Sequence, residues 1–194
     1  MQIKGLIFDM DGTLTVPLID FKEIRKELSI PSSGGDLAKI IASWPEPRRT
    51  QAWKIIEKYE IYAIENNCLQ EGVEAALERF AKANIRLAII TRNTARSTEA
   101  LLKKLSVEFD PILTREFPYI KPAPEPVLHI LDSWQIKADE CIMVGDYIHD
   151  IESANAAGAF SCYFKNPDVK HWYEEADFTV SSYQELENLV FNKS

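Results

Sequence analysis

Short, almost uninterrupted apolar runs alternate along the chain with segments whose apolar residues recur at helical spacing. The apolar runs predict strands at residues 3–8, 85–90, 111–114, 141–144, 159–164 and 178–180. The first, second and fourth runs are hydrophobic at nearly every position, which is typical of strands buried on both faces of a parallel sheet. Between the strands, apolar stripes predict helices at residues 73–83, 97–105, 126–134 and 151–157. This alternation predicts a three-layer α/β fold with a Rossmann-like, mostly parallel sheet.

Residues 16–71 depart from this alternation, because they contain no convincing strand. Helical segments are predicted at residues 20–29, 36–44 and 47–67, with proline- and glycine-containing breaks between them. A helical block between the first and second strands of a parallel sheet looks like a cap inserted over the edge of the sheet. We therefore expect a catalytic core of residues 1–15 and 72–194, and a small all-helical cap of residues 16–71.

Composition and charge narrow the possible partners. With 46% hydrophobic and 27% charged residues, the chain of 194 residues is typical of a globular protein with a real core. Its net charge is 22 − 30 = −8, and no basic run offsets this charge, so we expect no nucleic-acid partner. No apolar stretch is long enough to span a bilayer, and the first residues do not resemble a signal peptide. We expect a cytoplasmic protein that binds no membrane and is a monomer or a weak homodimer.

The three cysteines, Cys68, Cys141 and Cys162, are widely spaced and match no zinc pattern. Cys141 and Cys162 each lie within an apolar run, which favours buried free thiols and a reducing compartment.

Polar residues follow four of the predicted strands, at the point where each strand ends. They are Asp9 and Asp11, then Thr91, Arg92 and Asn93, then Lys121 after a loop, and finally Asp146 with Asp150 four residues further on. Parallel open sheets bind ligands at the carboxyl ends of their strands, so we expect these side chains to form one site.

In Asp9-Met10-Asp11-Gly12-Thr13, the two acidic side chains are two residues apart and can point into one pocket. Carboxylates this close repel each other unless a cation or a proton separates them. Mg²⁺ suits such a pair because it binds hard oxygen ligands and bridges to phosphate oxygens. Gly12 would permit a positive φ or a close backbone approach. The alternative is an acidic turn that merely ends a strand.

The second cluster is open to two interpretations. Thr91 and Asn93 could hydrogen-bond a phosphate oxygen near the start of the next helix, or Asn93 or Thr94 could simply cap that helix. Arg92 could bind an anion or be an exposed arginine without a function.

Lys121 and the second acidic pair also have structural alternatives. Lys121 lies in a proline-rich loop and could neutralise charge on a transferring phosphoryl group, although a lone lysine before such a turn is more often just solvated. Asp146 could bind a metal directly, and Asp150 could support it or cap the following helix. We expect His149, between the two, to be a surface residue.

These four clusters resemble, in order and rough separation, the four motifs of the haloacid dehalogenase-like superfamily. The first motif is Asp9-Met10-Asp11-Gly12-Thr13-Leu14-Thr15, the second Thr91-Arg92-Asn93, the third Lys121-Pro122 and the fourth Gly145-Asp146 with Asp150. The resemblance covers essentially the whole chain. The inserted helices resemble the cap of the phosphoglycolate phosphatase-like branch, although about 55 residues make a short cap.

The resemblance implies a Mg²⁺-dependent phosphatase that hydrolyses a small phosphorylated metabolite. Asp9 would be the nucleophile that forms an aspartyl-phosphate, and Asp11 the general acid and base. Thr91 and Lys121 would bind the phosphoryl oxygens, and the cap would close over the substrate. We expect Gly12, Arg92 and Asn93 to line the phosphate site. The metal ligands would be the Asp9 carboxylate, the Asp11 backbone carbonyl, Asp146 and, in support, Asp150.

Asp11 distinguishes the branches of this superfamily, because dehalogenases lack a second aspartate and halide departure needs no proton. Two alternatives to a phosphatase remain at this stage. One is a phosphosugar mutase with the same nucleophile, and the other is a catalytically silent binding or regulatory protein with the same fold.

Overall fold

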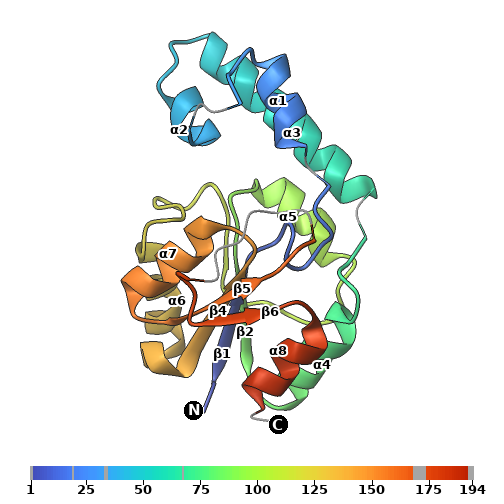
Figure 1. Ribbon diagram of the computed structural model, residues 1–194, viewed down its shortest axis with the longest axis vertical. Helices are drawn as coiled ribbons and strands as arrows, with labels where there is room; N and C mark the ends of the chain where they lie inside the picture. The colour runs from blue at the N-terminus through green and yellow to red at the C-terminus, as the bar shows by residue number, and fades with distance from the viewer. Residues whose placement is uncertain (1, 19, 33–34, 67, 168–173, 192–194) are drawn as a thin grey trace. The chain divides into compact units, whose positions relative to one another are not determined.

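The central feature is a parallel β-sheet. The computed structural model describes residues 2–18, 20–32, 35–66, 68–167 and 174–191. Within these residues six strands pair in parallel in the order β3-β2-β1-β4-β5-β6 (Figure 1). They are β1 (Gly5–Phe8), β2 (Arg86–Ile90), β3 (Ile112–Leu113), β4 (Cys141–Gly145), β5 (Phe160–Phe164) and β6 (Phe178–Val180). All six predicted strands are present, and the α/β fold is confirmed.

Strand β1 lies at the middle of the sheet, between β2 and β4. Phe8, its last residue, pairs with Ile89 of β2 and Val144 of β4, so the three strands end at nearly the same level. The backbone N–H of Asp9 donates to the Val144 carbonyl at 2.9 Å. Polar residues that follow these strands are therefore brought to one edge of the sheet.

Helices cover both faces of the sheet (Figure 1). The helices of this part of the chain are α4 (Val73–Lys82), α5 (Ala95–Leu102), α6 (Glu125–Trp134), α7 (Ile148–Ala157) and α8 (Tyr183–Val190), with a 3₁₀ turn η1 (Ala138–Glu140). One face packs against α6 and α7, where Ile7 and Met143 share a buried cluster with Val127. On the opposite face the ring of Phe8 stacks on Tyr183 of α8, with centroids 6.4 Å apart. None of the helices in the described parts of the chain has the length and apolarity needed to cross a bilayer.

Helix α8 was not predicted, although its buried residues Tyr183, Leu186 and Val190 follow helical spacing. Ser182 begins the helix, because its side chain accepts from the Glu185 backbone N–H at 3.2 Å. The predicted buried thiols Cys141 and Cys162 are confirmed: both are free and buried.

The chain divides into two compact units, Met1–Pro17 with Cys68–Ser194 and Leu18–Asn67. Within its described residues the second unit is helical, with α1 (Phe21–Glu27), α2 (Leu37–Ala42) and α3 (Arg48–Asn66). Asn67, the predicted end of the last helix, lies outside the described residues. This unit has a hydrophobic cluster of its own, formed by Ile24, Leu28, Ile30, Ile41, Ala52 and Ile56.

The two segments that join the units pair with each other inside the first unit. Thr15 forms an antiparallel bridge with Leu69. The Val16 N–H donates to the Cys68 carbonyl at 3.0 Å, and the Gln70 N–H donates to the Leu14 carbonyl at 3.0 Å. This pairing places Gln70 beside the loop that follows β1.

Candidate active site

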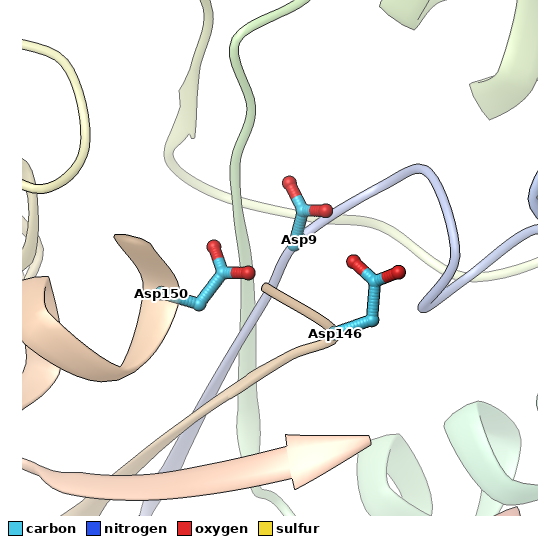
Figure 2. A group of neighbouring side chains, drawn as sticks. All are labelled: Asp9, Asp146 and Asp150. Atoms are coloured by element: carbon cyan, nitrogen blue, oxygen red, sulfur yellow. The ribbon is translucent and has the colours of Figure 1, made fainter. Parts of the chain in front are cut away.

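The four polar clusters meet at the carboxyl edge of the sheet. Asp9 follows β1 and Asp146 follows β4, while Asp150 projects from the first turn of α7 (Figure 2). Thr91 follows β2, and its backbone N–H donates to the Leu113 carbonyl of β3 at 2.9 Å. Lys121 reaches the same place from the loop before α6, through its contacts with two of these carboxylates.

Lys121 is a buried cation held between two acidic side chains. Its Nζ lies 2.5 Å from Asp9 Oδ1 and 2.6 Å from Asp150 Oδ1, and the side chain is 3% exposed. Burial alone would lower the pKa of Lys121, but Asp150 and Asp9 outweigh it and raise the pKa above its usual value. The interpretation of Lys121 as a solvated loop residue is therefore wrong.

Asp150 is not the N-cap residue of α7, but its side chain takes part in capping the helix. The helix begins at Ile148, with Tyr147 as the N-cap residue, and Asp150 lies in its first turn. Asp150 Oδ2 accepts from the Tyr147 N–H at 3.1 Å while Oδ1 faces Lys121. The helix starts three residues earlier than predicted, and its start orients this carboxylate.

Asp9, Asp146 and Asp150 form an acidic triad. One carboxylate oxygen of each lies within 4.8 Å of the others (Figure 2). Burial, and then the charge of Asp150, raise the pKa of Asp9 to about 6 even though Lys121 lowers it. Burial and the charges of Asp9 and Asp150 also raise the pKa of Asp146 well above its usual value. Crowded, desolvated carboxylates of this kind are stabilised by a hard cation, so the triad is able to hold a metal ion.

Two glycines let these carboxylates approach the backbone. Gly12 has φ +81°, and a Cβ on it would lie 2.1 Å from Asp146 Oδ2. A Cβ on Gly145 would lie 2.2 Å from the Asp150 carboxyl carbon. Both features expected of Gly12, a positive φ and a close approach, are confirmed.

Asp11 lies beside the triad and has a different partner. Its Oδ2 accepts from Asn93 Nδ2 at 2.7 Å. Burial and the charge of Asp9 raise the pKa of Asp11 to about 6, while the hydrogen bond from Asn93 lowers it. A carboxyl group with this pKa exchanges a proton near neutral pH, as general acid–base chemistry requires.

The residues after β2 have two roles: one of them caps α5, and the others lie in the candidate site. Thr94 caps α5, because its Oγ1 accepts from the Ser97 N–H at 3.2 Å. Asn93 is buried and turns to Asp11, and its own backbone N–H donates to Thr91 Oγ1 at 3.1 Å. Thr91 is buried beside it. Of the two capping residues considered, Thr94 is the cap and Asn93 belongs to the site.

Arg92 joins the loop after β2 to the first turn of α7. Its Nη1 lies 2.8 Å from His149 Nδ1, and the ring of Tyr147 meets the His149 ring edge-on at 4.9 Å. His149 is partly buried in this cluster, whereas a surface residue was expected at this position.

Two residues of the site had no place in the sequence-based prediction. Asn166 is buried, and its Nδ2 donates to the Gly12 carbonyl at 2.6 Å and to Asp146 Oδ2 at 3.2 Å. Gln70 Nε2 donates to the Gly12 carbonyl at 3.3 Å and to Asn166 Oδ1 at 3.0 Å. Asn166 comes two residues after β5, so the rule that polar residues at strand ends converge could have found it. Gln70 follows no strand, and no pattern points to it.

Residues 6–164 match the family model described as haloacid dehalogenase-like hydrolase, and the chain belongs to this family. The match confirms the predicted superfamily.

The chain is also similar in sequence or in fold to individual proteins. It is 36% identical to a haloacid dehalogenase-like hydrolase domain-containing protein of Arabidopsis thaliana, over 94% of this chain and 78% of that protein. It is 27% identical to a phosphoglycolate phosphatase of Chromobacterium violaceum, over 98% of each. The crystal structure of a predicted phosphoglycolate phosphatase from Haemophilus somnus shares the fold, with a TM-score of 0.76, 18% identity and coverage of 97% and 98%. The predicted class, a phosphohydrolase of this superfamily, is confirmed.

Proposed function

We propose that the protein is a Mg²⁺-dependent phosphatase that hydrolyses a small-molecule phosphate monoester through an aspartyl-phosphate on Asp9. One observation carries this proposal: Lys121 holds Asp9 directly, at 2.5 Å, beside a second acidic residue whose pKa is about 6. A nucleophile, a fixed cation and a proton-exchanging acid within one site are the groups that phosphoryl transfer to a carboxylate needs.

The acidic triad fits Mg²⁺ in donor type. Asp9, Asp146 and Asp150 would hold the ion, with the Asp11 backbone carbonyl as a further ligand. The carboxylates of the triad and of Asp11, with Lys121, carry a formal charge of −4 + 1 = −3, which an incoming phosphate would make more negative. Bound Mg²⁺ would supply the positive charge that the phosphoryl oxygens need.

In the first step, a carboxylate oxygen of Asp9 forms a bond to phosphorus while the bond from phosphorus to the leaving oxygen breaks. Asp11 gives its proton to that oxygen, which departs as an alcohol. Asn93 holds the Asp11 carboxyl group by its 2.7 Å hydrogen bond, so the acid is oriented before the substrate arrives.

In the second step, Asp11, now a carboxylate, takes a proton from a water molecule. The water oxygen bonds to phosphorus, the bond to Asp9 breaks, and inorganic phosphate leaves. Thr91 and Lys121 bind the phosphoryl oxygens in both steps. Thr91 Oγ1 already accepts from the Asn93 N–H, so its own proton is available to donate to substrate.

Arg92 and Gly12 complete the proposed phosphate site, and Arg92 supplies a second cation in it. The contact with His149 joins the Arg92 guanidinium, in the loop after β2, to the first turn of α7, which follows β4; β2 and β4 flank the nucleophile's strand. We assign substrate selection to the helical residues 16–71, as a cap.

The test is a screen of phosphate monoesters for phosphate release, with Mg²⁺ and with EDTA. Asp9→Asn should abolish release. Asp139→Asn, the same change at an exposed aspartate of η1, should leave it unaltered. Wild-type turnover in Asp9→Asn would contradict the nucleophile assignment. Isomerised product without free phosphate would show a mutase instead, and no turnover on any substrate would favour a silent binding protein.

A further inference from the structure

We propose that Asn166 is a positioning residue that orients Asp146 toward the metal, and that Gln70 fixes the orientation of the Asn166 amide. This inference rests on the proposed function only in requiring that the acidic triad binds a divalent cation. Neither residue touches the reacting atoms, and both act through Asp146.

The donor group of Asn166 is fully used. A side-chain amide nitrogen carries two hydrogens, and Asn166 Nδ2 meets two acceptors, the Gly12 carbonyl at 2.6 Å and Asp146 Oδ2 at 3.2 Å. The residue is 4% exposed, so water does not readily replace either bond. Asn166 therefore joins the loop after β1 to the carboxylate that follows β4.

Gln70 determines which way the Asn166 amide faces. Gln70 Nε2 donates to Asn166 Oδ1 at 3.0 Å, so Oδ1 must face Gln70 and Nδ2 must face Asp146. The reversed amide would place an oxygen against two acceptors and a nitrogen against a donor. The backbone of Gln70 is itself held by the Leu14 carbonyl. The segment that returns from the helical unit thus contributes a side chain to this network.

Electrostatics explain why Asp146 needs a donor. One carboxylate oxygen each of Asp9, Asp146 and Asp150 lies within 4.8 Å of the others, so their like charges repel and the Asp146 carboxylate needs a partner that holds it in place. The hydrogen bond from Asn166 to Asp146 Oδ2 restricts rotation of this carboxylate. Removing a partner that hydrogen-bonds a metal ligand typically weakens metal affinity or activity by 10- to 100-fold.

The experiment measures metal binding directly, without substrate. Mn²⁺ is titrated into the full-length protein and followed by the electron paramagnetic resonance of the free ion. Asn166→Ala and the similarly sized Asn166→Leu should each weaken Mn²⁺ binding by about 10-fold or more. Gln70→Ala should weaken it by a smaller factor, because Asn166 keeps its own two bonds. Asn155→Ala is the matched control, since it removes an exposed amide that donates to the Glu175 carbonyl at 2.8 Å.

A second measurement separates positioning from a general structural role. The Mg²⁺ concentration for half-maximal phosphatase activity should rise in the Asn166 variants, while the substrate KM at saturating Mg²⁺ stays near its wild-type value. Folded Asn166 variants that bind Mn²⁺ within twofold of wild type would overturn the inference. If neither variant folds, unchanged Mn²⁺ binding by Gln70→Ala overturns it.

Failure of the inference and failure of the proposed function give different results. A wild-type protein that binds no Mn²⁺ would remove the metal site, and with it both proposals. Normal wild-type binding with unchanged variants would remove only the role of Asn166.

Discussion

Replacing Lys121 with methionine tests the electrostatic centre of the site. Methionine has a similar length, so the change removes the charge and leaves most of the packing. Two carboxylates, 2.5 Å and 2.6 Å from Nζ, then lose their buried cation. Removing one partner of a buried ion pair costs about 3–5 kcal/mol of unfolding free energy. For a chain of this size that corresponds to a fall in Tm of roughly 6–20 °C near neutral pH.

The loss of stability should depend on pH, and its sign follows from Asp9. Burial and Asp150 raise the pKa of Asp9 to about 6, above the ordinary value of 3.8. A raised carboxyl pKa means that the folded chain binds the proton more tightly than the unfolded chain, so Asp9 costs stability as pH rises through this window. Lys121 reduces that cost. Without it the pKa of Asp9 rises further, so the deficit of Lys121→Met should be largest near pH 8 and should shrink toward pH 4.

The assay is urea unfolding in EDTA at both ends of that pH range. Lys82→Met is the control, because Lys82 is 76% exposed and pairs with Glu78 at 3.1 Å on the surface. This control should change stability by less than about 1 kcal/mol at either pH. A Lys121→Met protein as stable as wild type near pH 8, or with the same deficit at both pH values, would refute the electrostatic account. Its phosphatase activity should fall by at least about 100-fold.

Three further predictions concern the groups around Asp9. p-Nitrophenyl phosphate has a leaving group that needs no proton, so Asp11→Asn should still release one equivalent of p-nitrophenol in a burst and then stall, because no base activates the water. Steady turnover at the wild-type rate would count against Asp11 as the base. Asn93→Ala removes a hydrogen bond that lowers the pKa of Asp11, so this pKa should rise and the alkaline limb of the pH profile of kcat should move to higher pH. A shift of that limb to lower pH would be inconsistent with Asp11 as the acid. Tyr183→Phe removes the hydroxyl that donates to the buried Thr13 carbonyl at 2.9 Å. Urea unfolding should then show a loss of about 1–3 kcal/mol in the free energy of unfolding, with unchanged Mn²⁺ binding, and wild-type stability would contradict this.

The hydrophobic pattern was sufficient to predict where the strands lie, because strands buried on both faces are continuous apolar runs in the sequence. The run at residues 141–144 became β4, and the one at residues 178–180 became β6 with the same bounds. Helix ends were less predictable, since they depend on local hydrogen bonds. Helix α7 starts before Asp150 because the Tyr147 N–H bonds to that side chain. Helix α8 was missed even though its stripe was visible in the sequence.

In the candidate site, too, some features were predictable from the sequence and others were not. The positions of Asp9 and Asp146 after two strands predicted that they lie close together, and the acidic triad lies at the carboxyl edge of the sheet. Sequence left open whether Lys121 is solvated, because one lysine in a loop has no pattern. Burial between two carboxylates decided that question.

The sequence by itself determined the family, the parallel sheet and the residues that end its strands, because these depend on short motifs and on periodicity. Only the tertiary structure decided the partners of those residues. Asn93 turns to Asp11, Arg92 to His149, and Asn166 to Asp146, across separations of 20 to 82 residues. Contacts across such separations leave no periodic signal, since they arise only when the packed sheet brings the loops together. The acidic residues of the candidate site were therefore readable from their motifs, whereas the hydrogen bonds that orient them required the fold.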